Sequence, residues 1–193
     1  MVDTALIGAH HRMNFHKEDT IAHPADLVLD IMIQRIEAIV PYLPNIERID
    51  TLETKHLRDG RQHLIRRWQA SSDKLPKTLR PFISTEWLAW IDDALWSPAE
   101  YKVDWSLSTK LGRLYDCAGT NYLEPDPKAT DRRTRIRITG NLTVYPDRVP
   151  GIPALLSKHL APIVERFIVD LITPNLTSVA KGLDRYLKHE ARH

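Results

Sequence analysis

Two patterns in the sequence predict an α+β fold, in which a curved antiparallel β-sheet wraps around a long, kinked C-terminal α-helix. Residues 151–187 place apolar side chains at steps of three and four, which puts them on one stripe of a helix. The chain before them is a series of short alternating patterns that are typical of antiparallel strands. Because an apolar stripe needs a cover, we expect the strands to form one sheet that packs against the helix. The stripe consists of Val164, Phe167, Ile168, Leu171, Ile172, Leu176, Val179, Leu183, Tyr186 and Leu187.

The composition indicates one domain and excludes several classes of protein. The chain has 193 residues, enough for one sizeable core, so residues 1–193 are predicted to form a single domain. A formal charge of +2, from 27 Lys and Arg against 25 Asp and Glu, is too small for a general nucleic-acid binder. The single cysteine, Cys117, excludes an internal disulfide, and no Cys/His spacing matches a zinc site. We therefore expect no metal, no cofactor and no nucleic-acid partner.

The N-terminal sequence predicts a cytoplasmic protein. It lacks the basic start and apolar core of a secretory signal, and no apolar run in the chain approaches the roughly 20 residues of a membrane span. Residues 1–11 carry little pattern, so a loose leader is expected there.

The next segment predicts a strand followed at once by a helix. Residues 12–22 alternate loosely between apolar and polar side chains, as a strand does. Pro24 and Asp26 then start a helix, and Pro41 and Pro44 are expected to end it, since proline cannot donate the helical hydrogen bond. Its apolar face consists of Leu27, Val28, Ile31, Met32, Ile36 and Ile39.

A β-hairpin is the firmest local prediction. Strands at 49–57 and 61–70 flank the pair Asp59-Gly60, a dipeptide that favours a tight turn between two strands. Arg66 and Arg67 lie on opposite faces of the second strand, so one of them faces the buried side and needs a partner. The sequence leaves open which of the two it is.

The long connection that follows is a candidate lid. In residues 71–83 the apolar side chains Leu75, Leu79, Phe82 and Ile83 fall on one side of a helical turn or two. The alternative, that they close one end of the core, is equally consistent with this pattern.

Four further strands are predicted, at 85–91, 101–107, 114–123 and 134–145. Asp92, Asp93, Ser97 and Pro98 are the residues of a turn between the first two. Gly140 would let the last strand bend.

Two prolines divide the C-terminal helix. The apolar stripe continues in phase across Pro174, which indicates a kink there, whereas Pro162 is expected to be a true break. The first piece, residues 152–161, would then be able to shift and admit a ligand. Residues 152–160 are also amphipathic, which is consistent with a transient membrane contact or with ordinary packing on the sheet.

The chain resembles the helix-grip fold of the START and Bet v 1-like superfamily along nearly its whole length. The resemblance rests on residues 20–26 (TIAHPAD) leading from the first strand into a helix, on the run of strands, and on Gly151-Ile152-Pro153 before the last helix. The segment SSDKLPKTLRPFI, followed by STEWLAW, is most similar to the PRELI-like phospholipid carriers, which have a lid at a corresponding place.

The resemblance implies a ligand cavity between the sheet and the C-terminal helix, since a strongly curved sheet is not always filled by its own side chains. The expected lining is Arg66, Trp68, Trp87, Trp90, Tyr101, Trp105, Ile138, Leu142, Phe167, Leu171 and Val179, with a lid at Leu75, Leu79 and Phe82. Each of these residues is also consistent with ordinary core.

The leading functional hypothesis is a non-catalytic binder or carrier of a hydrophobic small molecule such as a lipid. One alternative is an enzyme resembling the polyketide cyclases or the hydrolases of this superfamily, with polar candidates at Arg66, Asp116, Tyr122 and His63. Another is an interaction module that uses the arginine stripe Arg132, Arg133, Arg135 and Arg137, although such a stripe is more commonly a solvated face paired with acids.

Overall fold

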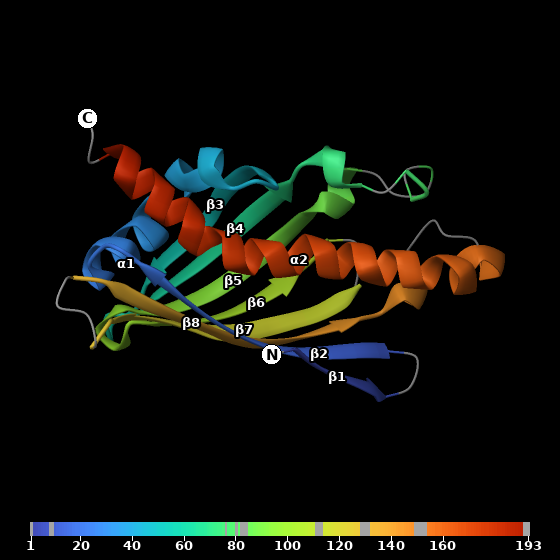
Figure 1. The fold of residues 1–193 in the computed structure, drawn as a ribbon, viewed down its shortest axis with the longest axis horizontal. Coiled ribbons are helices and arrows are strands. Elements are labelled where there is room, and N and C mark those ends of the chain that lie inside the picture. Colours follow the sequence, from blue (N-terminus) through green and yellow to red (C-terminus); the bar gives the residue numbers. More distant parts are fainter. Residues whose placement is uncertain are drawn as a thin grey trace.

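One curved antiparallel sheet and one long helix account for most of the chain (Figure 1). The computed structural model describes residues 2–7, 10–75, 77–79, 81, 85–110, 114–127, 132–148 and 154–190. The strands are β1 (Val2–Ile7), β2 (His10–Ile21), β3 (Ile46–His56), β4 (Gln62–Ala70), β5 (Ala89–Ser97), β6 (Lys102–Ser108), β7 (Tyr115–Pro125) and β8 (Thr134–Val144). The helices are α1 (Ala25–Gln34) and α2 (Ala154–Glu190), with short 3-10 helices η1 (Ile36–Tyr42), η2 (Ser72–Lys74), η3 (Thr85–Leu88), η4 (Pro98–Glu100) and η5 (Pro146–Arg148).

The strand order is β1-β2-β8-β7-β6-β5-β4-β3, and every neighbouring pair is antiparallel. Strands β3 to β8 follow one another as a meander, whereas β2 pairs with β8, so that α1 and η1 carry the chain from one side of the sheet to the other. Helix α2 lies across one face of the curved sheet (Figure 1). The predicted α+β helix-grip architecture is therefore confirmed.

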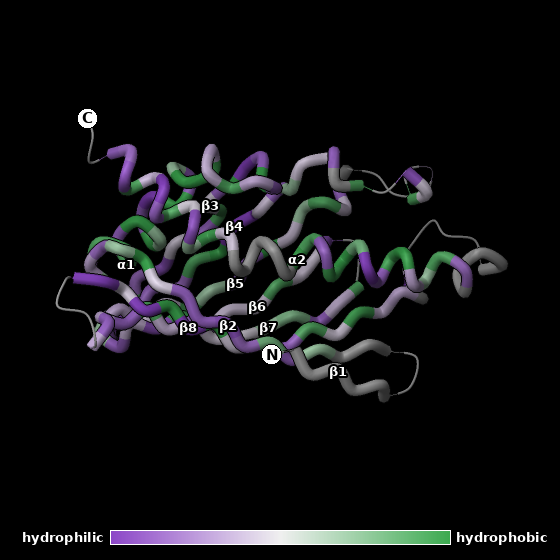
Figure 2. Tube along the Cα trace, in the orientation of Figure 1, coloured by the Kyte–Doolittle hydropathy of each residue, from purple (hydrophilic) through white to green (hydrophobic). Residues whose placement is uncertain are grey.

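The side chains of α2 that face the sheet form the predicted apolar stripe. Figure 2 shows apolar and polar residues alternating along this helix, as an amphipathic helix requires. Its buried side chains recur at three- and four-residue steps on both sides of the helix centre: Leu160, Val164, Phe167, Ile168, Leu171, Ile172, Ala180, Leu183 and Leu187.

The hairpin prediction is confirmed. Strands β3 and β4 pair around the turn, where Gly60 has a φ of +84°, a left-handed conformation that glycine adopts without strain. The Leu57 amide donates to the Arg61 carbonyl at 2.8 Å and closes the loop.

The structure corrects four local predictions. The expected leader forms β1, which pairs with β2 and so satisfies backbone groups of a strand that would otherwise be a sheet edge. The first α-helix ends at Gln34, well before Pro41, because Arg35 leaves the helical conformation (φ −142°), and the chain continues as η1 with Pro41 inside it.

The third correction concerns β5. Residues 85–88 form η3, and the strand runs from Ala89 to Ser97, so Asp92 and Asp93 lie inside a strand where a turn was expected. The fourth concerns Pro162: α2 is continuous from Ala154 to Glu190, although Figure 1 shows that it bends. A proline removes only one backbone bond, and the apolar stripe that packs on the sheet holds the helix together on both sides of it.

Candidate functional site

A cavity of about 100 Å³ lies between the concave face of the sheet and the helices. Its walls are mostly apolar, and they come from β4 to β8, α1, η1 and α2. The lining residues are Met32, Ile36, Arg66, Trp68, Trp90, Asp92, Ala94, Trp96, Val103, Trp105, Leu107, Asn121, Leu123, Ile136, Ile138, Ile172, Val179, Ala180 and Leu183.

Strand register explains why this set converges. On the concave face, β4 and β5 place Trp68 opposite Trp90 and Arg66 opposite Asp92. The Trp68 and Trp90 rings are stacked, with centroids 6.0 Å apart and an angle of 15° between their planes. Aromatic pairs of this kind form a flat, rigid and apolar wall.

A row of small residues makes room for the large rings. Trp105 pairs with Gly119, which pairs with Gly140, which pairs in turn with Phe15. A Cβ atom on Gly119 would clash with the Thr139 carbonyl and lie 2.6 Å from the Trp105 ring. The glycines therefore let the Trp105 and Phe15 rings, 6.3 Å apart, lean over the sheet.

Arg66 is the cation of the cavity. Its side chain is only 2% exposed, and its Nη2 donates to the Ile33 carbonyl at 2.6 Å while Nε donates to Thr51 Oγ1 at 3.4 Å. Burial lowers the pKa of the guanidinium, and the charges of Asp92 and Glu37 oppose that effect. Arg67 points to the other face of β4, which answers the question that the sequence left open.

Asp92 is the anion of the cavity. It lines the cavity, where it is half-buried and strongly desolvated. Burial raises the pKa of this carboxyl to about 6, and the Arg66 charge partly offsets the rise. The Trp68 indole N–H is close enough to the carboxylate to lower the pKa, although it does not reach hydrogen-bond geometry.

Two other indole groups complete the polar content of the cavity. Trp105 Nε1 donates to Asn121 Oδ1 at 2.8 Å, so both of these groups are satisfied. Trp96 Nε1 is buried and makes no hydrogen bond to the part of the chain that the structure describes.

Six of the predicted lining residues are brought together in this cavity: Arg66, Trp68, Trp90, Trp105, Ile138 and Val179. The other five lie elsewhere. Leu142, Phe167 and Leu171 are buried in the core outside the cavity.

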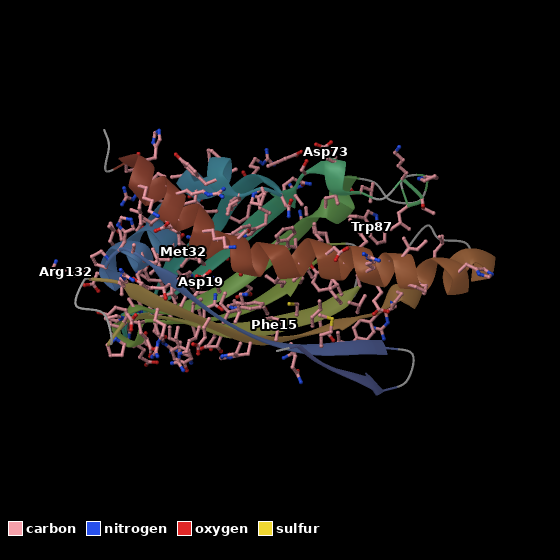
Figure 3. The ribbon with its side chains drawn as sticks, viewed as in Figure 1. Phe15, Asp19, Met32, Asp73, Trp87 and Arg132 are labelled. Carbon is pink, nitrogen blue, oxygen red and sulfur yellow. The ribbon has the colours of Figure 1, made fainter. Side chains whose placement is uncertain are left out.

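Trp87 and Tyr101 miss the cavity because neither lies in a strand. Trp87 is half-buried in η3, and Figure 3 shows it well separated from Met32, which does line the cavity. Tyr101 ends η4 with a left-handed φ of 52°; its ring is half-buried against the core outside the cavity, and its hydroxyl donates to Asp26 Oδ1 at 3.0 Å.

The lid residues do not line the cavity either. Leu75 and Leu79 are buried in the core, and Phe82 lies outside the described residues. A lid role for this segment stays a prediction.

The remaining polar candidates lie on the convex face, away from Arg66. Asp116 accepts a hydrogen bond from the Tyr145 hydroxyl at 2.6 Å, and His63 Nε2 lies 2.7 Å from Asp93 Oδ1. Tyr122 packs under Arg137, whose guanidinium carbon is 4.9 Å from the ring centre. Burial raises the pKa of the Cys117 thiol to about 12, so this cysteine is an inert core residue.

Two arginines of the stripe, Arg135 and Arg137, are paired on the convex face. Arg135 and Arg137 lie 3.3 Å and 3.0 Å from the same Glu124 carboxylate. This is the paired arrangement that the sequence favours for the stripe.

Among the described residues, no group of three or more His, Cys, Asp or Glu is arranged to hold a metal ion. None of the described helices is long and apolar enough to cross a membrane.

Asp92, Trp96, Val103 and Asn121 are among the cavity residues that sequence reasoning missed. The strand signal was present, because Trp90, Ala94 and Trp96 occupy alternate positions on the same strand as Asp92. The Asp-Asp pair outweighed that alternation, since aspartate is usually a turn residue.

No protein-family model matches the sequence, and no curated protein matches it. Solved structures do match. The protein TTHA0849 from Thermus thermophilus superposes with a TM-score of 0.60 at 16% identity, over 92% of this chain and 98% of its own. The Zhui aromatase/cyclase from a Streptomyces species gives a TM-score of 0.59 at 13% identity, over 92% of this chain and 96% of its own.

The ginseng major latex-like protein 151 from Panax ginseng is a third match, with a TM-score of 0.52 at 13% identity, over 91% of this chain and 97% of its own. These identities are low, so the comparisons establish the fold alone. The chain has the same helix-grip fold as these solved structures, a curved antiparallel sheet around a long C-terminal helix.

Proposed function

We propose that this protein binds a hydrophobic small molecule in the cavity between the sheet and α2. The observation that carries the proposal is an apolar cavity with four tryptophans, Trp68, Trp90, Trp96 and Trp105, and one charged pair, Arg66 and Asp92. Pockets for small molecules in proteins have this composition: apolar walls supply affinity and a few polar groups fix orientation.

The position of the charged pair supports a ligand rather than a purely structural role for the cavity. A carboxylate in an apolar space destabilises the folded state, which is why the pKa of Asp92 is raised to about 6. Groups with perturbed pKa values in cavities are candidates for functional roles. Asp92 and Arg66 would orient a polar group of the bound molecule.

Filling the cavity tests the proposal. Ala180 lies on α2, lines the cavity and is 5% exposed, so Ala180→Leu places three more carbons in that space. Ala99, exposed in η4, gives the same substitution at the surface as a matched control. We expect a hydrophobic fluorescent dye to bind the wild type and Ala99→Leu, and to bind Ala180→Leu at least about tenfold more weakly.

Mass spectrometry without denaturant, on protein from heterologous expression, complements the dye. We expect a bound molecule in the wild type and in Ala99→Leu, and a loss of it in Ala180→Leu. If the wild type binds neither dye nor any copurifying molecule, the proposal is wrong.

A second candidate is an enzyme related in chemistry to the ring-closing Zhui protein. The observation that favours it is Asp92, because a carboxyl with a pKa near neutral can exchange protons with a bound substrate. Incubation with linear polyketones, followed by mass spectrometry for the loss of water that accompanies ring closure, tests it. Turnover by the wild type that disappears in Asp92→Asn would support the enzyme, and binding without turnover would support the carrier.

A further inference from the structure

The cavity contains a buried hydrogen-bond donor without a partner. Trp68 lines the cavity and is 8% exposed, yet its Nε1–H bonds to nothing in the part of the chain that the structure describes. Buried N–H groups in folded proteins are almost always paired, so this donor is available to an acceptor on a bound molecule.

A carboxylate lies beside this donor. Asp92 is opposite Arg66 in the β4–β5 ladder, and Trp68 is opposite Trp90, so Trp68 and Asp92 are diagonal neighbours on the concave face. The influence of the indole N–H on the carboxyl also places the two groups close together. One small group could therefore contact both.

A hydroxyl is the group that satisfies both at once. It accepts a hydrogen bond from the indole N–H through a lone pair and donates its own proton to the carboxylate. An ether or a ketone can only accept, and an ammonium can only donate. The ligand also needs no net charge, because Arg66 already faces Asp92 and offsets its charge.

The size of the cavity limits the rest of the molecule. Its volume is about 100 Å³, and an engineered apolar cavity of about 150 Å³ holds one benzene molecule. The cavity is smaller than that reference, so one six-membered ring is the upper limit for a ligand here, and its entry requires the lining side chains to move outward. The stacked Trp68 and Trp90 rings offer a flat wall to such a ring.

We propose that the cavity selects a single-ring phenol or alcohol, whose hydroxyl accepts a hydrogen bond from Trp68 Nε1 and donates one to Asp92. This inference rests on the proposed function and narrows it to a ligand class. Trp96 does not carry the same argument, because the residue directly opposite it in the β4–β5 ladder is Gln62, whose buried Oε1 also lacks a partner among the described residues.

Phenol and toluene are the probes that test this proposal, because they differ only in a hydroxyl against a methyl group. A purely apolar cavity prefers toluene, which water solvates poorly, whereas a site that pairs the hydroxyl prefers phenol. We expect calorimetry at pH 7.5 to show phenol binding at least about tenfold more tightly than toluene. Trp68→Phe keeps a ring but removes the donor, and should abolish this preference, while Trp87→Phe, outside the cavity, should retain it.

NMR of the wild type gives an independent measurement if Trp68→Phe does not fold. On addition of phenol, the indole N–H signal of Trp68 should move in the direction of a stronger hydrogen bond, and that of Trp87 should stay in place. Toluene should not move the Trp68 signal in this way.

Each outcome separates this inference from the proposed function. A preference for phenol that depends on Trp68 supports the inference. Equal binding, or tighter binding of toluene, overturns the inference and leaves a hydrophobic ligand site in place. Failure of both probes together with failure of the dye and of any copurifying ligand overturns the proposed function, and the inference with it.

Discussion

Asp92 is the residue with the clearest effect on stability. Its pKa rises from an ordinary 3.8 to about 6 in the folded protein, so folding favours the protonated carboxyl. Between these two values the folded state holds more protons than the unfolded chain, and stability falls as pH rises through this window. Above pH 6 the loss of unfolding free energy is complete, and a pKa shift of this size corresponds to a loss of about 3 kcal/mol.

Asp92→Asn, which mimics the protonated form, is therefore expected to raise the free energy of unfolding at pH 7.5 by up to about 3 kcal/mol. At pH 4 the variant and the wild type should have nearly equal stability. Urea unfolding from pH 4 to pH 8 measures the difference. Asp93→Asn, on the exposed side of the same strand, is the control and should lack this pattern. A difference between Asp92→Asn and the wild type that is constant with pH would contradict the prediction.

Removing the charge of Arg66 is expected to destabilise the folded protein more than removing the charge of Asp92. Arg66→Met leaves the Ile33 carbonyl without its donor and Asp92 without its cation, so we expect a loss of about 3 kcal/mol in unfolding free energy. The pKa of Asp92 should also rise further above 6, which a ¹³C titration of its carboxyl measures. Arg67→Met, on the opposite face, should leave that pKa unchanged, and an unchanged Asp92 pKa in Arg66→Met would show that the two residues do not interact.

Of the pair Arg66 and Asp92, the sequence identified the arginine as a candidate and missed the aspartate. Alternation on a strand predicted that an arginine would face inward, because periodicity fixes which residues share a face. It could not choose between Arg66 and Arg67, since that choice depends on which face the helix covers. Asp92 was assigned to a turn because local propensity for Asp-Asp competes with a strand that only its tertiary neighbours stabilise.

Among the elements, β7 and β8 depend on the paired glycines Gly119 and Gly140, which face the Trp105 and Phe15 rings, respectively. In Gly119→Ala the new methyl group would meet the Thr139 carbonyl, a backbone atom that cannot rotate away, and the Trp105 ring at 2.6 Å. We expect a loss of at least about 2 kcal/mol in thermal or chemical unfolding.

Gly182→Ala in α2 is the matched comparison. Its Cβ would lie 2.8 Å from Leu43 Cδ2, the mobile end of a side chain, and alanine is a better helix former than glycine by about 1 kcal/mol. A stability close to that of the wild type is therefore expected. If Gly119→Ala lost no more unfolding free energy than Gly182→Ala, the prediction that Gly119 has no room for a methyl group would be wrong.

Element types followed from the sequence better than element ends. The β3–β4 hairpin and strands β6, β7 and β8 agree with prediction because turn residues and strict alternation are local signals. Pro162 was overinterpreted, since one missing hydrogen bond is small beside the apolar contacts of a 37-residue helix. The end of α1 depends on Arg35, whose change of conformation has no sequence pattern of its own.

In the whole molecule, the order of helices and strands was enough to predict the fold. The residues that line the cavity could be identified only from the register in which the strands pair. The row Trp105, Gly119, Gly140 and Phe15 joins β6, β7 and β8 to the distant strand β2, and only their pairing shows that two glycines lie under two rings. The same holds for Arg66 and Asp92, which are 26 positions apart and directly opposite in the sheet. A sequence can propose aromatic residues for a cavity, yet register decides which of them share it.

The arrangement of sheet, cavity and α2 makes a last prediction about the whole molecule. A ligand between the two layers contacts both, so it should slow local opening of each where they line the cavity. At 100 times its Kd, phenol should raise the unfolding free energy by about 2.7 kcal/mol. Hydrogen exchange should slow most at residues 179–183 of α2 and in β4 and β5, which line the cavity.

Strand β1 provides the internal reference for this measurement. It pairs on one side only, at the far edge of the sheet from β3 and β4, so its amides exchange by local fraying and should be unaffected by the ligand. Ala180→Leu, with its cavity filled, should show no ligand-dependent change in any segment. Slower exchange in β1 without a change in α2 would place the ligand outside the cavity, because a molecule held between the two layers cannot protect the edge of the sheet while leaving the covering helix free to open.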